Sequence, residues 1–438
     1  MNIIKIDIPN DIFSRQEPDG LQFVLRPAVG KPPHVALLDS PASDLWKKIQ
    51  QHSELDIENL PGSSLNILAQ LNDEGIIYLR DEKIILENGV APLSREEMGW
   101  RDPWHYQFAM PALHSPWFAL WEITDDCPLK TACHFCYRPK IVSGGPTLQQ
   151  AERICEQFIL NKIPWVTLLG GEPVVYPYLY EIIEQLRSMN IFVKMITNGV
   201  LINHQIASKL CDSGVHQVAV SLDGLDAENH DLNRGRGSFE KSLGAIRLLQ
   251  EFVPLVSISL TVTNRVFNQL DQLPSFCAAL NVPEVYISPL RMTNHTKLPD
   301  TDVGPLLPEQ QEYLQELVFS LNSSDLSVIN LSECSCGRSS VVIHSNGDIS
   351  ACPFATRHYG NVYKENFADI WAKITSSAIN IKRLTPNSRC FRKHEKEISK
   401  QSCASIEESR AYPKIASAEW ISGEHRGGGA VDQSPDRV

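Results

Sequence analysis

Three cysteines lie within ten residues of one another, at a spacing that suits an iron–sulfur site. Cys127, Cys133 and Cys136 stand in the segment Cys-Pro-Leu-Lys-Thr-Ala-Cys-His-Phe-Cys. Three thiolates can hold three irons of a [4Fe–4S] cluster, so that the fourth iron stays open to a chelating ligand. A structural zinc ion bound by these cysteines and His134 is the alternative that the same residue types leave open.

Candidate ligand-binding residues follow the predicted strand Trp165–Leu169. They are Gly170, Gly171, Glu172 and Pro173. Paired glycines let the backbone approach a ligand closely. The glutamate carboxylate can accept a charge-assisted hydrogen bond from a ligand ammonium group.

Further polar residues occur at the ends of the next two predicted strands. Asn198 follows the first of them, and Ser221 and Asp223 lie at the end of the second. Arg234, eleven residues beyond Asp223, could pair with a cofactor carboxylate or with a peptide substrate. Asn-Gly and Asp-Gly are also common turn sequences, so ordinary strand-to-helix turns are the alternative here.

The composition narrows the classes of partner. The chain has 438 residues and a formal net charge of −12, which argues against nucleic-acid or anionic-membrane partners. It contains no run of 18 uncharged apolar residues, and its N-terminus does not resemble a signal peptide, so we expect a cytoplasmic protein. Thiols stay reduced in that compartment, and clustered cysteines among the eleven are expected to bind metal or to catalyse.

Strands and helices alternate from about residue 117 to 295, which predicts an α/β fold with a parallel sheet. A parallel sheet and a barrel both fit this alternation, and six strand–helix units are too few for a closed eight-stranded barrel. Loops that follow parallel strands meet at one edge of the sheet, which would bring the cysteines and the polar turns together. The predicted strands are Trp117–Ile123, Trp165–Leu169, Phe192–Thr197, Gln217–Leu222, Val256–Val262 and Val285–Ser288.

Residues 1–92 are expected to form a separate winged-helix domain. They hold 14 acidic against 8 basic residues, and the third predicted helix contains no Lys or Arg, which argues against DNA binding. The predicted elements are strands at Ile3–Ile8 and Leu21–Leu25, helices after Ser40, at Glu54–Leu60 and at Ser64–Glu74, and a hairpin of Ile76–Leu79 and Lys83–Leu86.

The remaining boundaries follow from composition. The predicted segments are a linker at 93–116, the barrel at 117–300, a cysteine-rich region at 301–411 and a disordered tail at 412–438, which is rich in Gly, Ser and Pro.

Taken together, the first motifs resemble the radical S-adenosylmethionine (SAM) superfamily. Its usual motif is Cys-x3-Cys-x2-Cys with an aromatic residue before the last cysteine, which Phe135 matches, whereas the first spacing here is five residues. The Gly-Gly-Glu-Pro turn resembles the family's loop for the methionine amino group. Asn198, Ser221 and Asp223 resemble segments near the ribose and carboxylate of the cofactor, and Arg234 belongs to a later stretch that extends the match. The family carries a partial (β/α)6 barrel, which agrees with the six strand–helix units and is the fold that we expect. The resemblance implies a [4Fe–4S] cluster on the three cysteines and reductive cleavage of SAM to a 5′-deoxyadenosyl radical.

The cysteines of the last quarter resemble the SPASM extension of this superfamily. Cys336 and Cys352, with Gly347 between them, match its Cys-x10-Gly-x4-Cys opening, and its later cysteine run is reduced to Cys390 and Cys403. Because one cluster takes four thiolates, we expect one auxiliary [4Fe–4S] cluster on these four cysteines, as in the shorter Twitch form. A zinc site on the same cysteines is the alternative. Further candidate ligands are Cys334 and His394.

The stretch Val35–Tyr78 resembles the PqqD-like domain, which binds leader peptides of ribosomally synthesised and post-translationally modified peptides. Domains of this kind take the leader as an extra strand on a sheet edge. The resemblance implies a precursor peptide as partner, and an electron donor such as flavodoxin or ferredoxin. A small stabilising domain without a ligand is the alternative.

The resemblances together imply a radical SAM enzyme that modifies a precursor peptide. Crosslinking, thioether formation, epimerisation, decarboxylation and backbone excision all fit this layout, and no catalytic residue is assigned. Two alternatives come from other classes: a radical maturase of a folded protein such as a sulfatase, and a zinc-dependent binding protein without catalysis.

Overall fold

The computed structural model describes residues 3–9, 12–17, 20–26, 34–56, 60, 63–73, 76–80, 100–101, 113–138, 144–293, 295–323, 325–331, 337–355 and 357–384. Several sequence predictions fall outside these residues. They concern the strand Lys83–Leu86, the tail 412–438, and the candidate ligands Cys334, Cys336, Cys390, His394 and Cys403.

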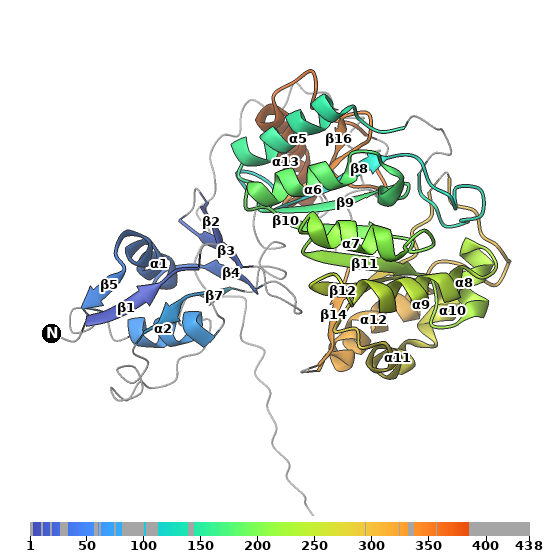
Figure 1. Ribbon diagram of the computed structural model, residues 1–438, viewed down its shortest axis with the longest axis horizontal. Coiled ribbons are helices and arrows are strands. Elements are labelled where there is room, and N and C mark those ends of the chain that lie inside the picture. The colour runs from blue at the N-terminus through green and yellow to red at the C-terminus, as the bar shows by residue number, and fades with distance from the viewer. Residues whose placement is uncertain are drawn as a thin grey trace, which may run out of the picture. The chain divides into compact units, whose positions relative to one another are not determined.

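One long sheet forms the barrel, in the order β14-β13-β12-β11-β10-β9-β8-β15-β16-β17 (Figure 1). Every pair from β14 to β15 in this order is parallel. The six predicted strands are confirmed, each to within one residue at either end, and β14 and β15 extend the sheet beyond them. The parallel strands are β8 (Phe118–Thr124), β9 (Trp165–Gly170), β10 (Phe192–Thr197), β11 (Gln217–Leu222), β12 (Leu255–Val262), β13 (Glu284–Pro289), β14 (Ser327–Asn330) and β15 (Ser340–Ile343).

Helices connect the parallel strands and lie along the sheet (Figure 1). The buried side chains of these helices are mainly apolar, as expected of amphipathic helices that pack on a sheet. In the first connecting helix, Thr147 caps the N-terminus in a capping box with Gln150, and Ile154 and Phe158 are fully buried. The helix that carries Arg234, α8, was not predicted. The connecting helices are α5 (Leu148–Leu160), α6 (Leu179–Ser188), α7 (His204–Asp212), α8 (Ala227–Arg234), α9 (Ser238–Leu249), α10 (Asn264–Phe267), α11 (Leu273–Leu280) and α12 (Pro308–Leu321).

The turn sequence Asn346-Gly347 predicts a hairpin of Val341–His344 and Asp348–Ala351. The structure confirms this hairpin, and its first strand joins the barrel sheet. β15 pairs with β16 (Asp348–Ser350) on one side and lies parallel to β8 on the other, with Ile343 opposite Trp121. β17 (Gly360–Asn361) then pairs with β16, and α13 (Phe367–Leu384) follows. The start of the C-terminal region is therefore continuous with the sheet beside its first strand.

The described N-terminal residues form two antiparallel sheets, β5-β1-β6 and β2-β3-β4-β7, and two helices. The predicted strands at Ile3–Ile8 and Leu21–Leu25 and the helix at Ser64–Glu74 are confirmed. The helix expected at Glu54–Leu60 is wrong, because Glu54–Asp56 is a strand that pairs with the first one. The elements are β1 (Ile3–Asp7), β2 (Phe13–Gln16), β3 (Gln22–Arg26), β4 (His34–Leu38), α1 (Ala42–Gln51), β5 (Glu54–Asp56), α2 (Ser63–Asp73), β6 (Tyr78–Leu79) and β7 (Trp100–Arg101).

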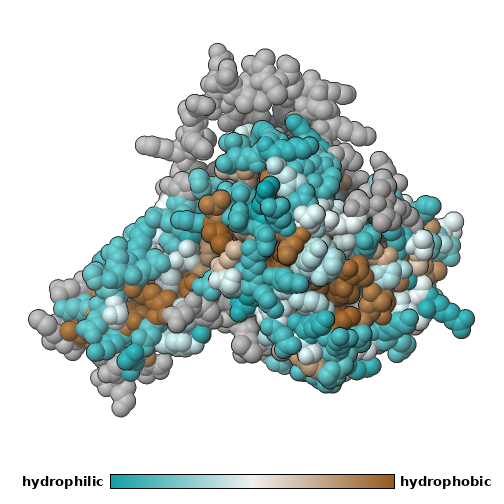
Figure 2. Space-filling view, turned by 45° about the horizontal axis from the view of Figure 1, so that its top comes forward, coloured by the Kyte–Doolittle hydropathy of each residue, from teal (hydrophilic) through white to brown (hydrophobic). Residues whose placement is uncertain are grey.

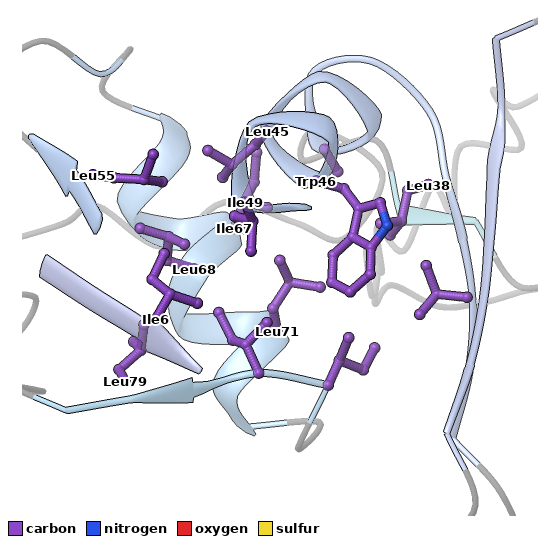
Figure 3. Packing of buried hydrophobic residues seen from close by; sticks show 14 of the residues in the cluster. Ile6, Leu38, Leu45, Trp46, Ile49, Leu55, Ile67, Leu68, Leu71 and Leu79 are labelled. Carbon is purple, nitrogen blue, oxygen red and sulfur yellow. The ribbon is translucent and has the colours of Figure 1, made fainter. Parts of the chain in front are cut away.

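A compact apolar cluster holds this N-terminal part together (Figure 3). Trp46 from α1 and Leu68 and Leu71 from α2 are fully buried and pack with Ile6 of β1. Burying each such aliphatic side chain contributes about 1.5–3 kcal/mol. The cluster therefore stabilises the arrangement of both helices on the sheet β5-β1-β6.

A second apolar cluster joins the sheet of β3 and β4 to the barrel. Phe23 packs on Trp117, with ring centroids 4.7 Å apart, and Trp165 and Phe192 belong to the same cluster. A buried ion pair supplements it: Arg15 Nη2 lies 2.6 Å from Glu17 Oε1 and donates to the Ser115 carbonyl. The first barrel strand therefore begins against the N-terminal sheet.

Among the described residues no helix is long and apolar enough to cross a membrane. On the face seen in Figure 2, hydrophobic side chains occur in separate patches between hydrophilic ones.

Candidate functional site

The loop after β8 carries the first three cysteines. Its longer spacing between Cys127 and Cys133 is folded into tight turns, because Lys130 N donates to the Cys127 carbonyl and Cys133 N donates to the Leu129 carbonyl. The amide of His134 donates to the Asn233 carbonyl of α8, which fixes the far side of the loop. The two extra residues are therefore absorbed in turns rather than moving Cys127 away.

The three thiols lie close enough to influence one another electrostatically. Burial raises the pKa of Cys127 to about 11 and that of Cys133 to about 12. The charge of Cys136 adds to both increases, and the charge of Cys127 adds to the increase at Cys133. Arg234 opposes this shift at both thiols. A metal centre would have to displace these protons, as thiolate ligation requires.

This donor set fits a cluster better than a single ion. Among the described residues, no three His, Cys, Asp or Glu side chains converge on a point that could hold one metal ion. The cysteines and His134 thus do not converge on one zinc position in the described structure. A [4Fe–4S] cluster spreads three thiolates over three irons, so the thiols need not converge on one point.

The glycine turn lies directly against the cysteine loop. Gly171 N donates to the Thr124 carbonyl at 2.7 Å, and Glu172 N donates to the Asp126 carbonyl at 2.7 Å. A Cβ atom at Gly171 would lie 2.1 Å from the Asp126 carbonyl oxygen, so only glycine allows this approach. Gly170 has a φ of +141°, which also favours glycine.

Glu172 is almost fully buried and joins two strand ends. Its Oε1 accepts a hydrogen bond from the Thr197 hydroxyl at 2.7 Å, and its Oε2 accepts one from Asn198 N at 2.8 Å. Burial raises the pKa of this carboxyl despite these hydrogen bonds. The sequence predicted an ammonium-binding role, and the structure adds that the carboxylate also organises the loop after β10. Pro173 follows in a short 3-10 helix (Pro173–Val175) and is buried.

The loop after β10 reaches the first cysteine. Asn198 Nδ2 donates toward Cys127 Sγ across 3.7 Å, and its Oδ1 accepts from Val200 N. Ser242 of α9 holds the Asn198 carbonyl at 2.9 Å. The predicted residue Asn198 therefore lies in the same site as the cysteines.

Asp223 and Arg234 form a buried ion pair beside the cysteines. Arg234 Nε and Nη2 lie 2.6 and 3.1 Å from the two Asp223 oxygens, and Asn233 also donates to this carboxylate. Burial acts to lower the pKa of Arg234, but Asp223 and the nearby Cys133 raise it overall. Arg234 was predicted to pair with a cofactor carboxylate or with a peptide substrate, and in this structure it pairs with Asp223.

The remaining predicted residues lie around the same edge. Ser221, half-buried at the end of β11, is opposite Ser259 of β12. Phe135 is half-buried, and its amide donates to Asn233 Oδ1 at 2.8 Å. In the second cysteine region, Cys352 is buried just after β16, and its three predicted partner cysteines lie outside the described residues.

A buried carboxylate that the sequence analysis missed lies next to the cysteine loop. Glu122 of β8 accepts a hydrogen bond from the Tyr137 hydroxyl at 2.8 Å and contacts Arg138 and His344. Burial acts to raise the pKa of Glu122, but hydrogen bonding to His344 and the charges of Arg138 and His344 lower it overall. A glutamate within an otherwise apolar strand was the signal that could have identified it.

Two segments of the chain match known sequence families. Residues 121–272 match the Radical SAM superfamily, and residues 334–405 match SPASM, an iron-sulfur cluster-binding domain. The chain is 30% identical to the mycofactocin maturase MftC of Mycobacterium tuberculosis over 285 residues, which cover 59% of this chain and 71% of that protein. This chain belongs to the radical SAM superfamily.

Two further proteins are similar to this chain, one in sequence over a shorter segment and one in fold over most of its length. The chain is 31% identical over 159 residues to an AdoMet-dependent heme synthase of Methanosarcina barkeri, covering 36% of this chain and 46% of that protein. Its fold is similar to that of Streptococcus suis SuiB bound to S-adenosylmethionine, with a TM-score of 0.57, 18% identity, and coverage of 83% of this chain and 88% of that one.

Membership of the radical SAM superfamily makes the protein an enzyme that binds a [4Fe–4S] cluster and SAM, with a partial α/β barrel and a SPASM iron-sulfur region. The predicted class of enzyme is thus confirmed. The alternative of a zinc-dependent binding protein without catalysis is wrong.

Proposed function

We propose that this radical SAM enzyme modifies a ribosomally synthesised precursor peptide, and that residues 1–92 bind the leader of that peptide. When bound, the cluster and SAM supply the one-electron cleavage that starts radical chemistry. We assign Cys127, Cys133 and Cys136 as the ligands of this cluster, and the turn Gly170–Pro173 with Phe135 as part of the SAM site. The other SAM-site residues in this assignment are Asn198, Ser221, Asp223 and Arg234.

The protein residues would position and shield the bound groups. Asn198 and Arg234 place a hydrogen-bond donor and a positive charge next to the thiolates. Glu172 has one hydrogen bond to Oε2 from the described residues, which leaves a lone pair that can accept from a ligand ammonium. Cys352 with Cys336, Cys390 and Cys403 would hold one auxiliary cluster.

One observation carries the peptide proposal. The fold similarity to SuiB spans 83% of the 438 residues, which is more than residues 113–438 can supply, so it includes part of the N-terminal 112 residues. A structure of SuiB bound to its precursor peptide SuiA shares this fold, with a TM-score of 0.52. The similar protein MftC is a mycofactocin maturase, which agrees with a substrate that is itself a gene product.

The test uses the whole chain, because removing residues 1–92 would expose the apolar cluster of Trp117, Trp165 and Phe192. A short peptide encoded beside the gene is supplied in full and without its N-terminal half, and its mass is followed with SAM and a strong reductant. We expect a mass change in the full peptide. The shortened peptide should be modified at least about tenfold less, because it lacks the affinity that a leader of modest binding strength contributes. Equal processing of both would refute leader binding, and modification of a folded protein instead would refute the peptide proposal.

We also propose that a small electron-transfer protein such as flavodoxin or ferredoxin reduces the cluster, and that the enzyme works in the cytoplasm. The free thiols of Cys127, Cys133 and Cys136 support a reducing compartment, since cluster assembly needs cysteines that are not in disulfides.

A further inference from the structure

A carboxylate in the first barrel strand lies between the two cysteine regions. Glu122 is 2% exposed, and a buried charge is costly unless its oxygens are paired. Oε1 accepts from the Tyr137 hydroxyl at 2.8 Å, and Oε2 contacts Arg138 and lies 2.6 Å from His344 Nδ1. The partners of one carboxylate thus come from two segments more than 200 residues apart in the chain.

On one side, Glu122 holds the end of the cysteine loop. Tyr137 and Arg138 directly follow Cys136, and Arg138 also pairs with Asp125, which directly follows β8. The carboxylates of Glu122 and Asp125, at the end of β8, therefore hold the two residues that directly follow the last cysteine of the loop.

On the other side, Glu122 holds the C-terminal hairpin. His344 Nε2 lies 2.9 Å from the Ser350 hydroxyl oxygen, and this hydroxyl donates to the Cys352 carbonyl at 3.0 Å. Ser345 adds a parallel link, because its hydroxyl donates to Asp125 Oδ2 at 2.7 Å. Hydrogen-bonded contacts thus run from Glu122 to the backbone of Cys352.

Ring packing reinforces the same connection. The Tyr137 ring meets the Phe354 ring edge to face, with centroids 5.1 Å apart, and Phe354 lies two residues after Cys352. The backbone pairing of β15 with β8 brings the hairpin near, but it does not set the direction of these side chains. A buried network of hydrogen bonds and ion pairs of this kind favours one geometry of the groups that it connects.

We propose that Glu122 is a positioning residue that couples the cysteine loop to the C-terminal hairpin, so that each cysteine region holds the other in its binding geometry. The proposal rests on the assignment of Cys136 and Cys352 as cluster ligands. A substitution at Glu122 should therefore alter both the cysteine loop and the C-terminal hairpin.

The test compares Glu122→Gln with Glu17→Gln in the full chain. Glu17 is also 2% exposed and also paired with an arginine, but it contacts Trp117, at the opposite end of the first barrel strand. The readouts are the EPR signals of the two clusters after anaerobic reconstitution, distinguished by their response to SAM, and amide hydrogen exchange of the segments 134–138 and 343–352 in the iron-free protein.

We expect Glu122→Gln to change both EPR signals and to speed exchange about tenfold in both segments, as the loss of a buried charged contact would. Glu17→Gln should leave all four readouts unchanged. Glu122→Gln and His344→Gln should affect the hairpin non-additively when combined, because they remove the same contact.

A response confined to one segment, additive effects of the two substitutions, or the same response to Glu17→Gln would overturn the coupling. Wild-type protein that forms no EPR-active cluster would refute the ligand assignments of the proposed function. The exchange measurement on iron-free protein would still decide the role of Glu122.

Discussion

Asn198 donates its side-chain amide toward the Sγ atom of Cys127 across 3.7 Å, which links the end of β10 to the first cysteine of the loop after β8. Hydrogen bonds to cluster sulfurs favour the reduced, more negative state and so raise the reduction potential. Asn198→Ala should therefore lower the midpoint potential of the SAM-binding cluster, measured by EPR-monitored titration. Asn203→Ala, which removes the N-terminal cap of α7, is the control. An unchanged potential in Asn198→Ala would show that the contact does not persist with iron bound.

Gly171 allows the glycine turn to touch the cysteine loop. In Gly171→Ala the new Cβ would meet the Asp126 carbonyl oxygen at 2.1 Å, so one backbone segment must move. We expect the variant to lose most of its cluster iron at Cys127, Cys133 and Cys136, as measured by iron content per chain and by the EPR response to SAM. Gly244→Ala is the control, because its Cβ meets nothing within 4 Å and should stabilise α9 by about 1 kcal/mol. Normal iron loading in Gly171→Ala would refute the close approach.

The barrel could be predicted from sequence because its signals are local. The strands at Phe192–Thr197 and Gln217–Leu222 are apolar runs bounded by turn residues, and their predicted limits match the structure. Asn198 and Asp223 were found because loops after parallel strands meet at one edge of the sheet.

The parts that were missed depend on pairing between distant segments. β15 was expected only in a hairpin, and its place beside β8 follows from contacts across more than 200 residues. Glu122 was missed for the same reason, because its partner His344 belongs to that hairpin. The segment Glu54–Asp56 became a strand through its pairing with β1, which outweighed its helical pattern.

The ion pair of Asp223 and Arg234 should show strong energetic coupling. Removing one member leaves a buried charge without its main partner, so Arg234→Ala should cost about 3–5 kcal/mol in the free energy of unfolding. Asp223→Ala combined with Arg234→Ala should cost less than the sum of the single changes. Thermal unfolding of the four proteins measures the cycle, and additive effects would contradict a coupled pair.

Lys194 should make stability depend on pH. Burial lowers the pKa of this lysine to about 7, against the opposing effect of Glu284, and its Nζ lies 2.9 Å from the centroid of the Tyr286 ring. As the pH rises from 7 to 9, the lysine loses its proton in the folded chain but keeps it in the unfolded chain, so this residue makes stability rise with pH. The rise is at most about 1.4 kcal/mol per pH unit.

The measurement compares the unfolding free energy of wild type and Lys194→Met at several pH values from 7 to 9. We expect the unfolding free energy of the wild type to increase relative to that of Lys194→Met as the pH increases. Lys209→Met is the control, because this exposed lysine also lies over a tyrosine ring, 5.3 Å from the centroid of Tyr180. A difference that stays constant from pH 7 to 9 would contradict the lowered pKa of Lys194.

Formation of 5′-deoxyadenosine by the anaerobically reconstituted full-length protein, with SAM and a strong reductant, tests the central claim most directly. The wild type should form it, and Cys127→Ala should reduce it to background, because the turns between Cys127 and Cys133 keep all three thiols in one site. Cys211→Ala, at an exposed position of α7, should form it at the wild-type rate. Equal formation by wild type and Cys127→Ala, or none by wild type that has taken up iron and SAM, would contradict the assignment of the three cysteines.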